Sequence, residues 1–279
     1  MKAAVISLQR HTFCAVLAGM AVTGAYAQVS SINSAIIKPR VFNDIPGAIP
    51  TYVNAYPGSI SLTESGVSAP TGFADRDVWY FSNNGGASAY NFLANDYFNA
   101  SFNITLTGGT SNLDLEAGFL FSNPSGNFGG DSQLIVSKNG TVAQFGGPSY
   151  YPFSPAAGGY PGAGGSVPNY TTGSTYNLGM IYTVDPNNGK NAFEYYVNGQ
   201  YAASAPGNRY FDLGAGQSVG SPGDFLGGYF QIQNAPNNPN NSGTALFGQI
   251  SIVPVTVPEP SAVALLGLGL SSLVLRRRR

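Results

Sequence analysis

Hydrophobic and polar residues alternate one by one along much of the chain from Val78 onward, which is the period of a β-strand that buries one face. Phe102, Ile104 and Leu106, for example, alternate with polar neighbours. A second apolar set of the same period consists of Leu113, Leu115, Ala117, Phe119 and Phe121. Residues 28–257 show no convincing 3.6-residue period of the kind that marks an amphipathic helix. The pattern predicts an all-β protein.

Short turn sequences divide this pattern into hairpins. Asn139-Gly140 lies between two predicted strands, and Asn-Gly supplies the positive φ angles that a type I′ turn requires. Asn198-Gly199 is a second such turn, and residues 185–189 form a longer one. These two turns are predicted to join three strands into a meander: 176–184, 192–197 and 200–204.

The remaining segments are less regular. Two closing strands are predicted at 228–234 and 244–253, and residues 28 to about 50 are expected to form an extended arm or a first edge strand. Residues 146–173 form a long Gly- and Pro-rich insert with five aromatic residues: Tyr150, Tyr151, Phe153, Tyr160 and Tyr170. A loop of this length in a compact domain is usually functional or mobile. Tyr150 and Tyr151 are therefore candidate sugar-stacking residues, with the alternative that the aromatic rings pin the loop to the sheet.

Residues 176–200 resemble the strand-turn-strand core of laminin-G-like and concanavalin-A-like lectin domains. The most characteristic part is the hairpin Tyr196-Val197-Asn198-Gly199, and a closing strand, 247–252, follows about fifty residues later. The resemblance implies a two-sheet antiparallel jelly-roll sandwich, a fold that many glycan-binding proteins and some glycanases share.

The N-terminus has the three parts of a secretory signal peptide. Lys2 and Arg10 supply a positive start, residues 12–22 an apolar stretch, and Ala25-Tyr26-Ala27 a small-x-small cleavage site. We therefore expect a signal helix that directs the chain to the Sec translocation machinery and is cut before Gln28.

The C-terminus carries an apolar segment with a basic end. Pro258, Glu259 and Pro260 precede the apolar run 262–275, which is followed by four arginines: Arg276, Arg277, Arg278 and Arg279. Such a segment inserts in a bilayer with its basic end in the cytoplasm. Residues 261–275 would span roughly 22 Å at about 1.5 Å per residue, against a hydrocarbon core of about 30 Å. The pattern predicts a short transmembrane helix that holds the protein only transiently at the inner membrane.

These parts, in this order, resemble the PEP-CTERM sorting signal of certain Gram-negative bacteria. The resemblance implies recognition by an exosortase, a membrane-embedded cysteine protease or transpeptidase that removes the tail as the protein goes to the cell surface or the extracellular polysaccharide matrix. The alternative is an ordinary tail anchor. The chain is thus predicted to comprise a signal peptide (1–27), a β-sandwich domain (28–254) and a sorting signal (255–279).

The composition of residues 28–257 excludes several catalytic chemistries. The only histidine, His11, and the only cysteine, Cys14, lie in the signal peptide, so the mature chain has neither. It therefore has no disulfide, no thiolate nucleophile, no Ser-His-Asp triad and no expected zinc site. From these exclusions we predict that the protein is not an enzyme.

Residues 28–257 are acidic and sparsely charged. They hold six basic and twelve acidic side chains, a formal net charge of −6. Nucleic-acid binding is not expected, because it needs a basic surface. Calcium is the one cofactor considered, since Asp185-Pro186-Asn187-Asn188-Gly189 is rich in oxygen ligands, but the bidentate acid of an EF-hand loop is missing and a plain β-turn is the preferred interpretation.

Asp114 and Glu116 share one face of a predicted strand, about 7 Å apart from two residues of rise. This separation is close to that of paired glycosidase carboxylates. Glycanases of the laminarinase type, which have the lectin fold, carry Glu-x-Asp-x-Glu along one strand, whereas Asn112 stands here at the position of the nucleophile. The preferred interpretation is a pair of solvated acids on the sheet face; ligands for calcium or sugar, and catalysts, are the alternatives.

Trp79 is the only tryptophan and follows Asp75 and Asp77. It is a candidate sugar-stacking residue, but an isolated tryptophan in an alternating strand is more often part of the core.

We therefore expect an exported surface or matrix protein whose jelly-roll domain associates with exopolysaccharide without catalysis. The alternatives are a purely structural biofilm protein and a glycan hydrolase or lyase that uses carboxylates or tyrosine. The third alternative predicts that Glu116→Gln abolishes cleavage.

Overall fold

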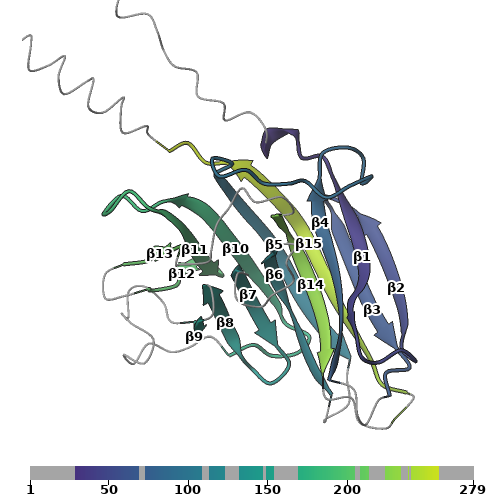
Figure 1. Ribbon diagram of the computed structural model, residues 1–279. Coiled ribbons are helices and arrows are strands. Elements are labelled where there is room, and N and C mark those ends of the chain that lie inside the picture. The colour runs from purple at the N-terminus through teal and green to yellow at the C-terminus, as the bar shows by residue number, and fades with distance from the viewer. Residues whose placement is uncertain are drawn as a thin grey trace, which may run out of the picture.

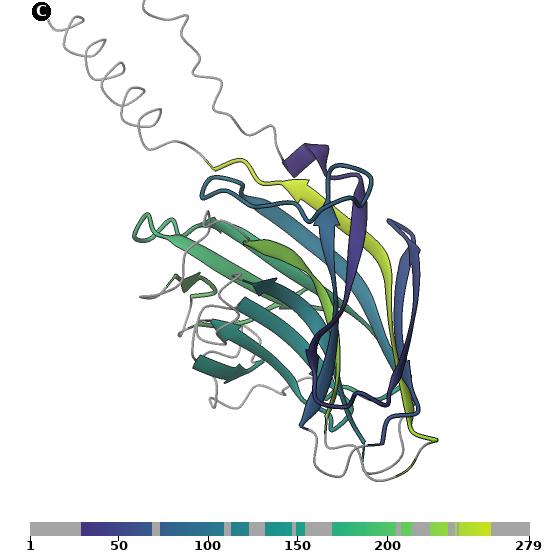
Figure 2. The ribbon, with the colours of Figure 1, turned by 45° about the vertical axis from the view of Figure 1, so that its right-hand side comes forward.

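A computed structural model describes residues 29–68, 73–108, 113–122, 132–146, 149–153, 169–204, 208–213, 224–233, 238 and 240–257. These residues form two antiparallel sheets packed face to face, as Figures 1 and 2 show. The all-β, two-sheet prediction is confirmed. The predicted signal and transmembrane helices lie outside the described residues. Within the described part, no helix has the length and apolar character needed to cross a membrane.

The seven-stranded sheet places strands side by side that are far apart in the sequence. Its order is β1 (Ser34–Asn43), β4 (Ala74–Ser82), β14 (Phe225–Gln233), β6 (Asp114–Ser122), β7 (Ser132–Ser137), β8 (Val142–Gly146) and β9 (Ser149–Pro152). All of these pairs are antiparallel. Because β14 pairs with both β4 and β6, it brings the end of the domain into the middle of this sheet.

The second sheet has β15, the longest strand of the described chain, near its centre. Its order is β12 (Gln200–Tyr201), β11 (Asn191–Val197), β10 (Thr175–Val184), β5 (Phe98–Gly108), β15 (Ser242–Pro254), β3 (Ser59–Ser65) and β2 (Ile49–Ala55), with β13 (Phe211–Asp212) paired to β11. The short helix η1 (Val29–Ser31) precedes the first strand. It lies at the same end of the sandwich as the end of β15, so both ends of the described domain leave from one side (Figures 1 and 2).

The core between the sheets is rich in aromatic rings. Trp79 is fully buried there, with its ring 5.2 Å from that of Phe81, 5.6 Å from Phe247 and 5.9 Å from Phe102. The alternation noted in the sequence puts Phe102, Ile104 and Leu106 of β5 in this core, as predicted.

Gly228 of β14 makes room for the tryptophan ring. A Cβ at this position would lie 2.5 Å from Trp79 Nε1 and 2.7 Å from a ring carbon of Phe247. Gly228→Ala should therefore lower the free energy of unfolding by about 1–3 kcal/mol, the usual cost of overpacking a core. Chemical denaturation measures this change. Gly47→Ala, where an added Cβ meets nothing within 4 Å, is the control and should stay near the wild type.

Most predicted strands are present, and the structure adds four that were not predicted: β2, β3, β9 and β13. The meander is β10, β11 and β12, the closing strands are β14 and β15, and β1 is the predicted first edge strand. β2 and β3 were missed, although Ile60 and Leu62 alternate with serine, because the pattern before Val78 is short and interrupted by turns.

The turn at Asn139-Gly140 differs from its prediction. Only Gly140 has a positive φ, +96°, so this hairpin does not contain a type I′ turn. Asn139 instead accepts a hydrogen bond from the Thr141 amide at its side-chain oxygen, at 3.0 Å. At Asn198-Gly199 both φ angles are positive, 50° and 78°, as the type I′ turn requires.

Candidate functional site

A row of polar side chains crosses four strands on the outer face of the seven-stranded sheet, the face turned away from the other sheet. The strand registers align Arg76 of β4, Gln231 of β14, Glu116 of β6 and Ser137 of β7. Arg76, Gln231 and Ser137 are each less than 10% exposed. Buried polar groups must find hydrogen-bond partners, so this row forms a specific network rather than a solvated surface.

Tyr229 of β14 is the centre of the network, which we call the Glu116–Tyr229 site. Its phenol donates a hydrogen bond of 2.5 Å to Glu116 Oε1, and the Gln133 side-chain oxygen lies 3.4 Å from the phenol oxygen. The Arg76 guanidinium lies over the Tyr229 ring, 4.8 Å from the ring centroid, and Arg76 Nε donates to Gln231 Oε1 at 2.5 Å. Charged partners make such hydrogen bonds short and strong.

Burial raises the pKa values of both members of the pair. The pKa of Glu116 is raised by burial and, to a smaller extent, by the charge of Asp114, whereas the Tyr229 hydrogen bond and the charge of Arg76 lower it. Burial and the neighbouring Glu116 carboxylate raise the pKa of Tyr229 well above its ordinary value, against the opposing charge of Arg76. A carboxyl group with a raised pKa beside a protonated phenol is suited to proton transfer.

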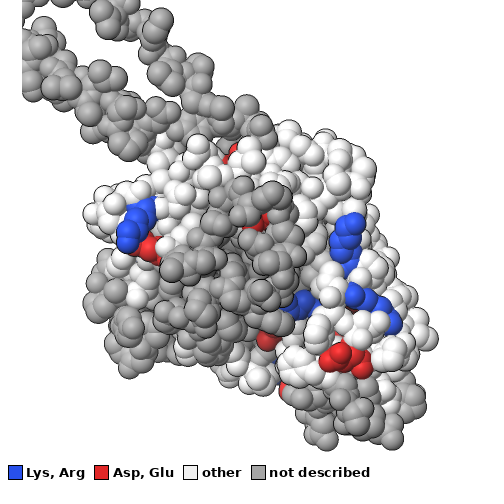
Figure 3. Space-filling view, in the orientation of Figure 1, with Lys and Arg blue, Asp and Glu red and all other residues white. Residues whose placement is uncertain are grey.

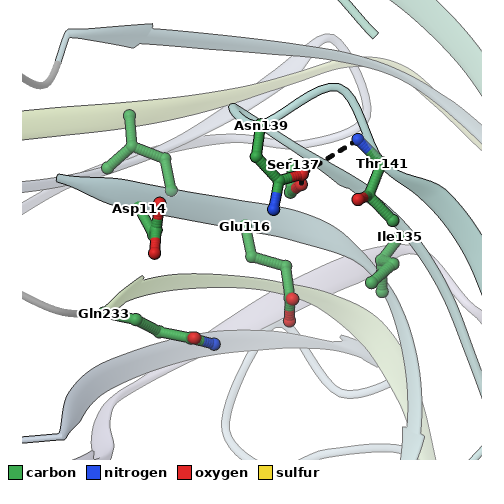
Figure 4. Close-up of a pocket in the computed structure, with 8 residues that line it drawn as sticks. Asp114, Glu116, Ile135, Ser137, Asn139, Thr141 and Gln233 are labelled. Carbon is green, nitrogen blue, oxygen red and sulfur yellow. Dashed lines mark hydrogen bonds between the residues drawn. The ribbon is translucent and has the colours of Figure 1, made fainter. Parts of the chain in front are cut away.

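A pocket of about 200 Å³ opens beside Glu116, at the end of the site where β6 begins (Figure 4). Asp114 and Gln233 flank it from neighbouring strands, and the β7–β8 turn closes the other side through Ser137, Asn139 and Thr141. Asp114 and Glu116 thus share one strand face, as predicted. Glu116 is partly buried and hydrogen-bonded, however, so it is not the solvated acid that the preferred interpretation described.

Trp79 takes no part in this site. It was a candidate sugar-stacking residue, but its side chain has no exposed surface and lies on the opposite, core side of β4. The core interpretation of Trp79 is confirmed, and the ligand-binding one is wrong.

The aromatic insert is described in part. Its first residues form β9, in which Tyr150 and Tyr151 pair with β8 at the edge of the sheet that carries the Glu116–Tyr229 site; their side chains lie outside the described structure. Phe153 and Tyr170 are buried in the core, and the Tyr170 phenol accepts a hydrogen bond from the Leu106 amide at 2.7 Å. These two rings pin the ends of the insert to the sheets, while Tyr160 lies outside the described residues.

Sequence reasoning missed Arg76, Gln133, Tyr229 and Gln231. The available signal was the alternation of β14, in which Tyr229, Gln231 and Gln233 share one face opposite Phe230 and Ile232. That pattern could not show that β14 lies between β4 and β6.

Within the described residues, neither the charged side chains nor the possible metal ligands form a further candidate site. These contain no group of three or more acidic, histidine or cysteine side chains placed to hold a metal ion. Asp185 forms a turn in which its Oδ1 accepts a hydrogen bond from the Asn187 amide at 2.8 Å. Figure 3 shows only small, scattered groups of charged atoms on the side in view, apart from the grey atoms.

Residues 256–279 match the family model of the PEP-CTERM protein-sorting motif. The C-terminus is a PEP-CTERM motif. This match confirms the resemblance found in the sequence, and it implies export and processing by an exosortase. Pro258, Glu259, Pro260 and the four arginines of the motif lie outside the described residues, as do Ala25 and Ala27 of the predicted signal-peptide cleavage site.

Solved structures with a similar arrangement of strands include polysaccharide lyases and a lectin domain. The alginate lyase AlgAT5 of polysaccharide lyase family 7 is 11% identical, with a TM-score of 0.43, covering 74% of this chain and 82% of that chain. The alginate lyase from Corynebacterium sp. is 10% identical, with a TM-score of 0.43 and coverages of 79% and 93%. The carbohydrate recognition domain of Emp46p, in its metal-free form, is 8% identical, with a TM-score of 0.40 and coverages of 77% and 91%. No curated protein sequence matches the chain.

These matches correct one prediction. The absence of histidine and cysteine from residues 28–257 led us to predict that the protein is not an enzyme, and the matched alginate lyases contradict that prediction. The physical reason is that a carboxyl group and a phenol can also act as general acids and bases, and Tyr229 donates a hydrogen bond to Glu116 without either missing residue type.

Proposed function

We propose that this exported protein holds polysaccharide at the cell surface or in the extracellular matrix, and that it does so at the Glu116–Tyr229 site. One observation carries the proposal: a network of tyrosine, glutamine, arginine and glutamate side chains lies on the face of the seven-stranded sheet that is turned away from the other sheet, and the pocket beside it is lined by Glu116. Sugar hydroxyl groups are both donors and acceptors, so amide and carboxylate groups in fixed positions can orient them.

A second candidate function, cleavage of the bound polysaccharide, is favoured by the 2.5 Å hydrogen bond between Tyr229 and Glu116. Hydrolysis and β-elimination of a glycan both need groups that remove and donate protons at the scissile bond. The pair supplies one carboxyl group and one phenol, and Arg76 adds a fixed positive charge beside the ring that would stabilise a developing anion.

The proposal also includes the steps by which the protein reaches the cell exterior. The signal peptide is cut after Ala27, the PEP-CTERM segment holds the chain transiently in the inner membrane, and an exosortase releases it. Since both ends of the described domain leave from one side, the domain would hang from the membrane by that side while the segment is intact.

Retention on polysaccharide tests the binding proposal. The exported protein should be retained on the exopolysaccharide of the producing bacterium, and replacing both Tyr150 and Tyr151 by alanine should weaken retention at least tenfold, since these residues lie on β9 at the edge of the same sheet. Tyr52→Phe, a change inside the sandwich, is the control and should bind as the wild type does. Equal retention of the double variant would favour a structural role for the insert.

A further inference from the structure

The opposite surface of the sandwich, the outer face of the eight-stranded sheet, carries an ordered array of hydroxyl groups. The strand registers place Thr51, Thr63, Thr244 and Thr107 side by side across β2, β3, β15 and β5. The Thr63 and Thr244 hydroxyls are hydrogen-bonded to each other at 2.9 Å. Neighbouring strands lie about 4.8 Å apart, so the four side chains form a straight row.

Amide groups continue this array along the same face. Asn177 of β10 donates a hydrogen bond of 3.0 Å to Asn103 of β5, and Asn103 donates one of 2.8 Å to the side chain of Gln249. Thr105 and Thr175 hydroxyls are joined at 2.7 Å across the same two strands. These bonds hold the polar groups in place before any ligand arrives, which reduces the entropy lost on binding.

Two tyrosines bound the array on the β11 side. Tyr196 lies over Gly179, where a Cβ would be 1.8–2.3 Å from three atoms of its ring, so the ring rests on the sheet. The Tyr196 phenol donates to Asn99 Oδ1 at 3.2 Å, and the ring of Tyr201 lies 5.6 Å away. Both side chains are partly exposed, and exposed aromatic faces pack well against the C–H faces of sugar rings.

The face is uncharged from Tyr196 to Thr51. The outward side chains of β2, β3, β15, β5 and β10 include no Asp, Glu, Lys or Arg. The nearest charges on this sheet, Glu194 and Arg209, form an ion pair at 2.5 Å on β11 and beside it, and the Arg209 guanidinium lies over the Tyr201 ring, 4.4 Å from its centroid. Because Arg209 is paired with Glu194 and the strands from β10 to β2 carry no charge outward, an acidic polymer or an anionic membrane would find no unpaired cation along these strands, whereas a neutral, hydroxyl-rich chain matches them in charge and in hydrogen bonding.

We propose that this face is a second binding surface, separate from the Glu116–Tyr229 site, and that its ligand is an uncharged polysaccharide chain. The chain lies across β10, β5, β15 and β3, with sugar rings against Tyr196 and Tyr201 and hydroxyl groups on the threonine and asparagine side chains. A protein with a polysaccharide site on each face of its sandwich would cross-link the matrix around it.

Co-sedimentation with insoluble uncharged polysaccharides, namely cellulose, curdlan and chitin, tests this proposal. The exported protein should sediment with at least one of them. Tyr201→Ala and Thr107→Glu should each reduce the bound fraction at least tenfold, whereas Tyr201→Phe, which keeps the ring, should bind as the wild type does. Thermal melting checks that each variant is folded.

The variant Glu116→Gln tests this surface independently of the proposed function. It lies on the opposite face and should leave sedimentation with the uncharged polymers unchanged, so failure of one site does not imply failure of the other. The proposal is overturned if none of the three polymers binds, if Tyr201→Ala and Thr107→Glu bind as the wild type does, or if Glu116→Gln abolishes the binding. It is also overturned if sedimentation velocity shows a dimer that Thr107→Glu dissociates, because a second copy would then be the occupant.

Discussion

Replacing Glu64 by glutamine should make the protein more stable than the wild type above neutral pH and should remove part of its pH dependence. Glu64 of β3 is buried between the sheets, where burial, together with the nearby Asp77, raises its pKa from 4.5 to about 8. Arg40 lies 4.0 Å away, and its positive charge offsets this increase only in part. In the wild type Glu64 therefore keeps its proton through neutral pH.

The direction of the pH effect follows from proton binding. Between pH 4.5 and about 8, unfolding releases the Glu64 proton, because the unfolded chain ionises this group and the folded chain does not. The contribution of Glu64 to the free energy of unfolding is therefore complete below pH 4.5. As the pH rises from 4.5 to about 8, this contribution falls by about 1.4 kcal/mol per pH unit for one proton. Glutamine cannot ionise, so the variant should lack this component.

Urea denaturation at several pH values measures the effect as the difference in free energy of unfolding between the two proteins. The difference should grow from pH 5 to pH 8 in favour of Glu64→Gln. Asp44→Asn, at an exposed acid, is the control and should show no such growth. A constant difference across this range would mean that Glu64 is ionised in the folded protein and that its buried charge is compensated.

Most strands of this fold could be predicted because each depends on its own alternation. Phe102, Ile104 and Leu106 are apolar because they face the core, and no knowledge of neighbouring strands is needed to see it. The same local rule fails for Asp75 and Asp77, which lie inside β4 and point toward the core although they look like a polar segment before a strand. Their partners are the Ile45 amide and the Arg40 amide, more than 25 residues away, and no local pattern contains that information.

The site shows the same division between local and distant information. Asp114 and Glu116 were found because they are two residues apart on one strand. Tyr229, which turns Glu116 from a surface acid into a hydrogen-bonded group, is 113 residues further along the chain. Only the pairing of β14 with β6 brings them together, so the sequence pointed to one half of the pair and missed the other.

Glu116→Gln and Tyr229→Phe should each reduce polysaccharide cleavage by about 10²–10⁴-fold, the usual contribution of a general acid or base. Each variant removes one proton-carrying group and keeps the shape of the side chain. Cleavage is measured on the exopolysaccharide of the producing bacterium, by the appearance of reducing ends. New reducing ends with a new carbon–carbon double bond would indicate elimination, and reducing ends alone would indicate hydrolysis.

Asp114→Asn provides the matched control, because it changes a neighbour of the pair and not the pair itself. The charge of Asp114 raises the pKa of Glu116, whereas the hydrogen bond from Tyr229 lowers it. The Glu116 pKa should therefore fall in Asp114→Asn and rise in Tyr229→Phe, which NMR titration of the carboxyl carbon can follow in both. If Glu116 acts as a base, Asp114→Asn keeps its activity and its rate declines at a lower pH than that of the wild type. Full activity in Glu116→Gln would exclude the pair from the chemistry and leave the site with binding alone.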